Sequence, residues 1–487
     1  MALFNKNIKE ATLTLNRAGG QAYAMTAEMQ LASMLLTSFA QDQFYRKAES
    51  TYSELTALLG KVSPEFAAKA AIYTRTEFGM RSITHVLAAE LAAYLSGKEW
   101  AKSFYNKIVY RPDDMMEIIA YYYAIGGKTL PNAMKKGFAK AFDKFDAYQL
   151  AKYRGEAKAV KLVDIVNLVH PTPSERNEDA LKALVEGLLK STETWEAKLT
   201  EAGQKAENEI EKTAMKAEAW AELLRNKKLG YFALLRNLRN IAVQAPFLVN
   251  EACDMLTNQK LIQKSLVLPF RYLTAMDAVK GLETGTYRAL TKALNKAMEL
   301  ALSNVPVFDG RTLVVLDDSG SMTWGDVKGM GRRPIDIGAL FAAMLYKSNN
   351  ADLMTFSDRA RYLRLNPEDS LQTLSETLIN KAASGGTNFH AIFEVANKAY
   401  DRIIILSDMQ GWVNGYSPAS AYKAYKKSYS TDPFIYSFDL QGYGTLQFPE
   451  NKVFALAGFS EKVLDLMAML EADPRALVNK INAIELL

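Results

Sequence analysis

The chain of 487 residues is longer than one hydrophobic core usually serves, so its length predicts two domains. Apolar residues make up 49% of it, no run of about eighteen apolar residues occurs, and the start MALFNKNIKE lacks the apolar core of a signal peptide. A single cysteine, Cys253, excludes an intrachain disulfide and a thiolate metal cage, and three histidines argue against a histidine-rich metal site. We therefore expect a cytoplasmic protein without a membrane span.

Positive charge is concentrated in the N-terminal part. Residues 1–300 carry 41 Lys and Arg against 33 Asp and Glu, a balance of +8, whereas the rest of the chain carries 18 against 21, a balance of −3. A basic domain of this size is typical of a polyanion binder. An ordinary surface with a slight lysine surplus explains the same balance, so charge alone leaves both interpretations open.

Residues 22–302 have the apolar periodicity of helices. MTAEMQLASMLLTSFA and SPEFAAKAAIYTRTEFG place apolar residues three and four positions apart. Paired segments span about forty residues, the spacing of HEAT-like helical pairs that stack into a solenoid. We assign residues 1–304 to this domain and expect the charged stretch 193–228 to be a long solvated helix or an excursion from the stack. Further helices are expected at 81–95, 113–124, 131–144, 178–190, 206–226, 230–241 and 285–302.

After Pro306 the pattern changes to strands that alternate with helices. The predicted strands are TLVVLDDS, ADLMTFS, RIIILSD, PFIYSFDL and KVFALAG. The predicted helices are IDIGALFAAMLYKS, SLQTLSETLINKA, FHAIFEVANKAY, SPASAYKAYKKS and EKVLDLMAML. This alternation predicts a doubly wound α/β domain with a parallel sheet over residues 305–487. Ligands of such sheets bind at the carboxyl ends of the strands.

Oxygen-bearing side chains gather at those carboxyl ends. Asp317, Ser319 and Ser321 follow the first strand, Thr387 lies in the loop SGGTN, and Asp408 follows the strand RIIILS. Hydroxyl and carboxylate oxygens are the ligands that Mg²⁺ prefers, and no nitrogen or sulfur ligand accompanies them. The set predicts a site for Mg²⁺ or another divalent cation that binds rather than catalyses, because no general base lies beside it. A polar turn capped by serines is the alternative.

The order and spacing of these residues resemble a known site. D-x-S-x-S is followed by Thr387, 70 residues after Asp317, and by Asp408, 21 residues later. This pattern is similar to the metal-ion-dependent adhesion site of von Willebrand factor A domains. The resemblance implies that Ser319, Ser321 and Thr387 contact the metal, with the two aspartates bound directly or through water. A carboxylate or phosphate oxygen of a partner would fill the open coordination position.

Other segments extend the resemblance over nearly the whole chain. LNRAGGQAY (15–23) resembles the N-x-A-G-G start of the TROVE module, and LGYFALLRNLRN (229–240) resembles its A-L-L-R-N-L segment. VNGYSPASAYKAYKK and LAGFSEKVLDLM resemble the end of the A domain in Ro autoantigen proteins. The chain is thus similar to bacterial or phage-type relatives of the Ro sixty-kilodalton autoantigen.

The resemblance implies a specific function. Ro proteins are rings of helical repeats closed by the A domain. They bind small noncoding Y RNAs on the outer surface and take single-stranded ends of misfolded RNA into a basic hole. Bacterial relatives are joined through Y RNA to an exoribonuclease, polynucleotide phosphorylase. On this basis we expect a monomeric RNA-binding scaffold for RNA quality control, not an enzyme.

One segment carries the implied RNA contacts. LAKYRGEAKAVKLVDIVNLVHPTPSERN (150–177) resembles the family's K-Y-K … H-x-x-P stretch, and its matching residues are Lys152, Tyr153, Arg154 and His170. Lysine and arginine would contact phosphates, whereas tyrosine and histidine would stack or hydrogen-bond. His170 also suits a helix C-terminus, where it would meet the helix dipole.

Further basic residues leave alternatives open. Lys136, Lys140 and Lys144 recur every four residues, which indicates either a track for phosphates or a solvated helix face. Arg236 and Arg239 would either line the hole or cap neighbouring helices. A different class of function also fits the chain, namely a protein-interaction module in which the A domain grips a partner carboxylate through Mg²⁺ and the solenoid holds a peptide.

Overall fold

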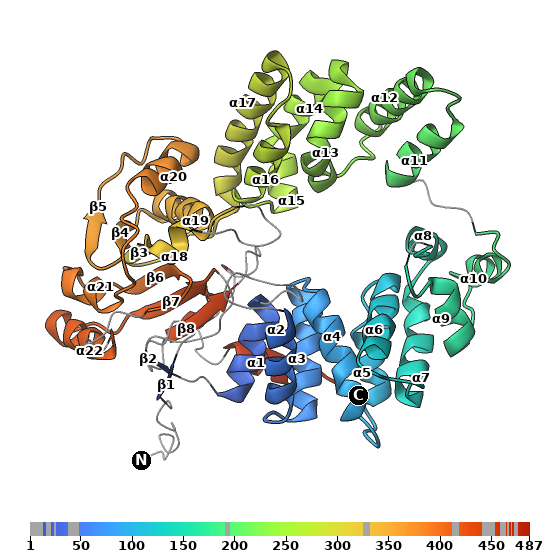
Figure 1. Ribbon diagram of the computed structural model, residues 1–487, viewed down its shortest axis with the longest axis horizontal. Coiled ribbons are helices and arrows are strands. Elements are labelled where there is room, and N and C mark those ends of the chain that lie inside the picture. The colour runs from blue at the N-terminus through green and yellow to red at the C-terminus, as the bar shows by residue number, and fades with distance from the viewer. Residues whose placement is uncertain are drawn as a thin grey trace.

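Helices form most of the molecule, and a single sheet domain lies near both ends of the helical part. The computed structural model describes residues 13–15, 21–23, 26–37, 48–156, 158–189, 195–324, 332–411, 418–440, 453–457, 464, 467–468, 470–471 and 476–487. Figure 1 shows the helices following one another around an arc, with the sheet domain between the two ends of that arc. No helix in these residues is long and apolar enough to cross a lipid bilayer.

The first part of the arc consists of short helices with ordinary end signals. The Ser63 hydroxyl accepts the Phe66 N–H at 3.1 Å and Pro64 takes the first helical position, which together start α3. Asp146 and Gln149 form a reciprocal capping box at the start of α8. These elements are β1 (Leu13–Leu15), β2 (Gln21–Tyr23), α1 (Ala27–Thr37), α2 (Ala48–Leu59), α3 (Pro64–Glu77), α4 (Ser82–Glu90), α5 (Ala101–Lys107), α6 (Pro112–Ala124), α7 (Asn132–Ala141), α8 (Ala147–Lys152), α9 (Leu162–Val169) and α10 (Glu178–Val185).

The second part of the arc corrects one expectation. The stretch 193–228 is not one long solvated helix, because α11 and α12 form a hairpin and Asn208 caps the start of α12. Trp220 and Leu223 of α12 are buried where it packs on α13, so this hairpin belongs to the stack. The elements are α11 (Trp195–Lys205), α12 (Glu209–Arg225), α13 (Tyr231–Gln244), α14 (Val249–Leu256), α15 (Gln259–Ser265), α16 (Arg271–Val279) and α17 (Thr284–Leu300). Their assignment to the HEAT class stays a prediction.

The C-terminal part is the predicted α/β domain. Its six strands lie in the order β5-β4-β3-β6-β7-β8, and only the edge strand β5 is antiparallel to its neighbour. The elements are β3 (Thr312–Asp317), α18 (Gly320–Thr323), α19 (Pro334–Asn349), β4 (Asp352–Phe356), β5 (Ala360–Leu363), α20 (Leu371–Asn380), α21 (His390–Val395), β6 (Arg402–Ser407), α22 (Pro418–Tyr429), β7 (Phe434–Asp439), β8 (Val453–Ala457) and α24 (Ala476–Asn482).

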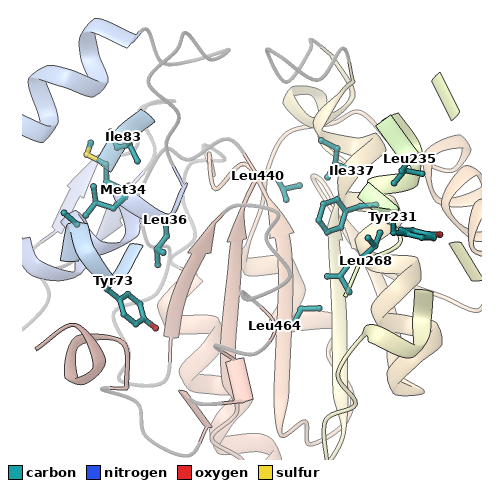
Figure 2. Close-up of a cluster of buried hydrophobic side chains, with 14 of the residues drawn as sticks. Met34, Leu36, Tyr73, Ile83, Tyr231, Leu235, Leu268, Ile337, Leu440 and Leu464 are labelled. Carbon is teal, nitrogen blue, oxygen red and sulfur yellow. The ribbon is translucent and has the colours of Figure 1, made fainter. Parts of the chain in front are cut away.

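Strand residues alternate between two cores. Val314 and Leu316 of β3 belong to the large core, to which buried residues of the helical part and of α19 also contribute. Leu313 and Val315 face a second core, which includes residues of α21 and α22. This period of two explains why the strand is apolar throughout, since both faces of the sheet are covered. Figure 2 shows the large core, with Met34 and Tyr73 from the N-terminal helices and Ile337 and Leu440 from the sheet domain.

The sheet domain contacts both ends of the helical arc. On one side Phe270 stacks on Phe341 of α19 at 5.1 Å between ring centroids, and Lys347 forms an ion pair with Glu299 of α17 at 2.9 Å. On the other side α24 packs against α3, and the Lys107 ammonium donates to the Glu485 carbonyl at 2.7 Å. The C-terminal residues that we assigned by sequence to the second domain therefore pack on the first.

Some sequence expectations need correction or are not described. The helix expected over 389–400 ends at Val395, and the sequence pattern did not predict β5 or α24. Both are short, so they carry little periodicity. The motif LNRAGGQAY falls on β1 and β2, and its residues 16–20 lie outside the described residues, as does most of the expected helix over 461–470.

Candidate metal centre and nucleic-acid interface

The predicted oxygen cluster is assembled at the carboxyl edge of the sheet. Asp317 ends β3 and Asp408 follows β6, the strand that pairs with β3 in parallel. Both aspartates are fully buried. The Ser319 N–H donates to Asp317 Oδ1 at 2.9 Å, and the Ser319 and Ser321 hydroxyls lie 3.4 Å apart. Ser321 also hydrogen-bonds Asp408, so the D-x-S-x-S turn connects the ends of both strands.

The Thr387 loop is held against this turn by backbone bonds. The Gly320 N–H donates to the Gly385 carbonyl at 2.8 Å, and the Ser384 N–H donates to the Asp318 carbonyl at 2.8 Å. Thr387 itself is buried. A Cβ on Gly385 would lie 2.3 Å from Asp358 Oδ2, so glycine permits the close approach at this position.

Burial makes the two aspartates unusual. Burial raises the pKa of Asp317 well above its usual range, and the nearby Asp408 carboxylate raises it further. Burial likewise raises the pKa of Asp408, against the hydrogen bond from Ser321 that lowers it. Asp408 Oδ2 is buried and has no hydrogen-bond partner among the described residues. An unpartnered carboxylate oxygen beside a second buried carboxylate and several hydroxyls is a donor set that fits a small divalent cation.

Sequence reasoning missed three residues of this edge. Asp439 ends β7 opposite Ser407, is buried, and raises the pKa of Asp408 through its charge. The Ser407 hydroxyl donates to Asp317 Oδ2 at 2.5 Å and holds that carboxylate in place. Trp324 is 72% exposed just after the D-x-S-x-S turn. Two of the three could have been predicted from the sequence. Ser407 and Asp439 end predicted strands and so must lie on the same edge as Asp317.

Asp318, the second acid of the motif, has a different place. Its carboxylate forms an ion pair with Arg361 of β5 at 2.6 Å and accepts the Ala383 N–H at 3.2 Å. It therefore fastens the loop before Thr387 to the D-x-S-x-S turn. Within the described residues no three His, Cys, Asp or Glu side chains are grouped to hold a metal ion, so a cation here would depend on the serine and threonine oxygens.

The start of the predicted RNA segment, at Lys152 and Tyr153, belongs to a row of alternating tyrosines and cations that Tyr148 and Arg111 complete. Lys152 is exposed at the end of α8, with its ammonium 5.9 Å from the centre of the Tyr148 ring and 5.6 Å from that of Tyr153. The Arg111 guanidinium lies over the Tyr153 ring at 4.4 Å. We call Tyr148, Lys152, Tyr153 and Arg111 the cation–aromatic ladder. Tyr148 is 50% exposed, and the neighbouring Tyr110 is 60% exposed.

A buried ion network fixes one end of this ladder. Asp113 accepts two hydrogen bonds from the Arg111 guanidinium, at 2.9 and 2.7 Å. Asp114 is fully buried and accepts hydrogen bonds from Arg75 and His85 and from the N–H groups of residues 110 and 111. Burial alone would raise the pKa of Asp114, but His85 and Arg75 lower it well below its usual range. The network thus joins α3, α4 and α6 beneath the ladder.

The other sequence-matched residues are placed differently from Lys152. The Arg154 guanidinium donates to the Leu189 carbonyl and forms an ion pair with Glu156 at 3.1 Å, so its charge is already partnered. His170 is exposed and ends α9 in the left-handed conformation (φ 47°), with its N–H donating to the Val166 carbonyl at 2.9 Å. It is therefore a helix C-cap, and a contact with RNA stays a prediction.

The prediction that three lysines line one face of a single helix is wrong for Lys144. The helix ends at Ala141, and Lys144 instead donates to the carbonyls of Asn106 and Val109. Burial lowers the pKa of Lys144 to about 8. Lys136 and Lys140 are exposed, and Lys140 forms an ion pair with Asp143 at 2.6 Å.

Helix α13 presents a second exposed face. Arg236 and Arg239 are exposed and form no ion pair with any described residue. Phe232 and Val243 are exposed at helical spacing on the same face. We call these four residues the α13 stripe. The arginines do not cap any helix of the described residues, whereas a place inside a hole stays a prediction.

Comparison with known protein families agrees with this architecture. The TROVE domain model matches residues 14–214 and 188–320, and the Ro60 vWA domain model matches residues 311–470. Since the TROVE match covers more than half of the chain, the fold and the site define a TROVE-domain protein with a von Willebrand A-type domain. The chain belongs to the Ro family.

The chain is also similar to individual proteins of known name or structure. RNA-binding protein RO60 of Deinococcus radiodurans is 23% identical over 466 residues, covering 86% of this chain and 87% of that protein. Telomerase protein component 1 of Mus musculus is 25% identical over 349 residues, 53% of this chain and 13% of that protein. The crystal structure of the Deinococcus radiodurans RO (RSR) protein superposes with a TM-score of 0.64 at 19% identity, over 93% of this chain and 99% of the other, and shows the same fold.

Proposed function

We propose that this protein is an RNA-binding scaffold of a Ro-type ribonucleoprotein. The observation that carries the proposal is the cation–aromatic ladder, which lies in the basic helical part and includes Lys152 and Tyr153 of the segment that resembles the family's RNA-contacting stretch. The exposed Tyr148 beside the exposed Lys152 suits RNA, because a ring stacks on bases while an ammonium group binds phosphates. The relative named RNA-binding protein RO60 supports the same class of ligand.

The finer proposal follows the Ro family. A small noncoding Y-like RNA binds at the ladder on the ring surface, and single-stranded ends of misfolded RNA bind in the basic hole, where the α13 stripe supplies two free arginines. The protein acts in the cytoplasm as a monomer for RNA quality control, and polynucleotide phosphorylase or a similar exoribonuclease joins it through the RNA. Purified protein with bound RNA should show a high ratio of absorbance at 260 to 280 nm. Protein free of RNA when isolated under gentle conditions would oppose this proposal.

We also propose that the protein has no ribonuclease activity. The described part of the cluster edge places no histidine beside its serine and threonine hydroxyls, and His390 Nε2 lies 3.1 Å from the Glu394 carboxylate instead. Labelled single-stranded RNA incubated with the protein and Mg²⁺ should stay intact. Cleavage that persists through several columns and disappears on replacing one residue of this chain would contradict the scaffold function.

The cluster at the carboxyl edge is proposed to bind Mg²⁺. Ser319, Ser321 and Thr387 would hold it directly, and the buried carboxylates of Asp317 and Asp408 would bind it directly or through water. When bound, the cation would neutralise the repulsion between the two carboxylates and offer one position to a partner oxygen. The unpartnered Asp408 oxygen supports this proposal.

Replacing Asp317 with asparagine should distinguish the effect of the metal on stability from the effect of the buried carboxylate itself. The folded-state pKa of Asp317 is raised, so the metal-free folded protein retains a proton that the unfolded chain loses above about pH 4, and its stability falls as pH rises from there toward the raised pKa. We expect Asp317→Asn to raise the metal-free melting temperature at pH 7 and to abolish the further rise that Mg²⁺ gives the parent protein. The exposed Glu368→Gln serves as the control, and an unchanged Mg²⁺ effect in Asp317→Asn would exclude the site.

A second candidate function is a protein-interaction module. The exposed Trp324 favours it, because a large aromatic beside a cation site is a typical anchor for a protein partner. In this case the A domain grips a partner carboxylate through Mg²⁺ and the solenoid holds a peptide. Copurification of a protein that EDTA releases, in a preparation without RNA, would favour this alternative.

A further inference from the structure

A cavity of about 700 Å³ opens at the amino edge of the A-domain sheet, opposite the metal cluster. Its walls include the beginnings of β3 and β4 at Thr312 and Asp352 and the end of β5 at Leu363. The volume lies within the usual range for sites that hold a small organic ligand, roughly 300–1,000 Å³. This cavity shares no residue with the metal cluster or with the cation–aromatic ladder.

Positive charge predominates in the cavity. Among the described residues that line it, four carry cationic side chains and Asp352 is the single carboxylate. Lys347 is neutralised by Glu299 at 2.9 Å, and Lys398 by Asp352 at 2.8 Å. The remaining two cations, Arg311 and Arg364, are exposed and form no ion pair with any described residue. Two guanidinium groups that form no ion pair in one concave site attract a dianion, and the nearby Asp401 carboxylate, which accepts the Arg311 backbone N–H at 2.7 Å, opposes this attraction in part.

The strand register explains why the two arginines meet. Leu313 of β3 pairs with Asp352 of β4, and Leu353 pairs with Leu363 of β5. Arg311 therefore precedes β3 and Arg364 follows β5 on either side of β4, with neighbouring strands about 4.8 Å apart. Both side chains are long enough to reach one phosphate placed between them. The carbonyls at the end of α19 add roughly half a negative charge nearby, which is smaller than the charge of the two arginines.

Tyrosine rings supply the apolar wall. The Tyr346 hydroxyl donates to the Leu365 carbonyl at 2.7 Å, and the Tyr362 hydroxyl is 2.9 Å from that of Tyr400. Because their hydroxyls are engaged, the rings are held in place and present their carbon atoms to the cavity. A flat aromatic ligand that carries a phosphate matches this combination of fixed rings and free guanidinium groups.

We propose that this cavity binds a nucleoside phosphate, with the phosphate on Arg311 and Arg364 and the base against Tyr346 and Tyr362. The ligand comes either from free mononucleotide or from the phosphorylated terminus of an RNA strand. The proposal does not depend on RNA binding at the ladder. It adds a nucleotide site to a domain whose net charge is negative.

Calorimetric titration of the full chain with adenosine 5′-monophosphate in EDTA tests the proposal, because EDTA removes any phosphate binding through a metal. We expect saturable binding of the nucleotide and at least tenfold weaker binding of adenosine. Arg364→Ala should weaken the nucleotide by roughly tenfold or more, since hydrogen bonds to a charged group are lost. Arg359→Ala is the matched control, because this exposed arginine lies at the other end of the same β4–β5 hairpin, on the metal edge.

Each outcome bears on the proposal. Displacement of the nucleotide by a 5′-phosphorylated oligoadenylate, but not by its 5′-hydroxyl form, assigns the site to strand ends, whereas no displacement assigns it to free nucleotide. No binding up to millimolar concentration, equal binding of adenosine, or unchanged affinity in folded Arg364→Ala overturns the proposal. Lys152→Ala should bind the nucleotide like the parent protein, so failure of the RNA interface and failure of this site are distinguishable.

Discussion

Replacing Asp114 with alanine is expected to lower the free energy of unfolding by about 3–5 kcal/mol, because it leaves buried positive charge without its partner. The Arg75 guanidinium donates to this carboxylate at 2.9 and 3.0 Å, and both side chains are buried. Two backbone N–H groups at the start of α6 also lose their acceptor. Urea unfolding measures the change. Asp143→Ala, which breaks the exposed pair with Lys140, is the control and should change stability by less than about 1 kcal/mol.

The loss of stability in Asp114→Ala should also depend on pH. The pKa of Asp114 is lowered in the folded protein, so its contribution is fully present above its unfolded pKa of about 3.9 and is lost as pH falls through the lower folded pKa. The difference in stability between the parent and Asp114→Ala should therefore change little from about pH 5 to 7, which is about one to three pH units above that value, and shrink in more acid solution. A difference that stays constant in strong acid would show that Asp114 acts through packing and not through its charge.

RNA affinity should fall most when the exposed ring and the exposed cation of the ladder are removed together. Tyr148→Ala loses a stacking surface worth about 1–3 kcal/mol per base, and this loss should not alter the salt dependence of binding. Lys152→Ala loses one phosphate contact and should reduce the slope of log K against log salt by about 0.7 for single-stranded and 0.9 for duplex RNA. Filter binding over a salt series separates the two effects.

Matched variants make this test specific. Tyr148→Phe keeps the ring and should bind RNA like the parent protein, whereas Tyr123→Ala removes an exposed tyrosine at the end of α6 opposite to Arg111 and should have little effect. Arg154→Ala should reduce the slope by less than Lys152→Ala, because Arg154 is already partnered by Glu156 and the Leu189 carbonyl. If Tyr148→Ala and Lys152→Ala both bind RNA with the affinity and the salt slope of the parent protein, RNA does not touch this face.

The metal cluster could be predicted from sequence because strand topology decides it. Once Asp317 and Asp408 are recognised at the ends of parallel strands, the fold must bring them to one edge, and the structure does so. The same rule would have identified Asp439 and Ser407. Sequence gave no means to separate Asp318 from the site, because its partner Arg361 lies on β5, a short strand without a clear pattern.

The RNA face could be predicted only in part, because it depends on contacts between distant residues. Lys152 and Tyr153 were found from a resemblance, but Arg111 lies over Tyr153 only because α6 and α8 meet in space. Lys144 was misplaced since the helical period continues in the sequence after the helix has ended at Ala141. The cavity at the amino edge was invisible for the same reason, as its free arginines belong to segments on either side of β4.

Photo-crosslinking of the full chain to the RNA with which it is isolated, followed by mass spectrometry of the crosslinked peptides, tests the scaffold proposal most directly. The proposal predicts that RNA is recovered and that the crosslinks fall on the ladder, at Tyr148 and Tyr153. In Tyr148→Ala the crosslink at position 148 should be lost. Crosslinks confined to residues 305–487, or a native preparation without RNA, would contradict it.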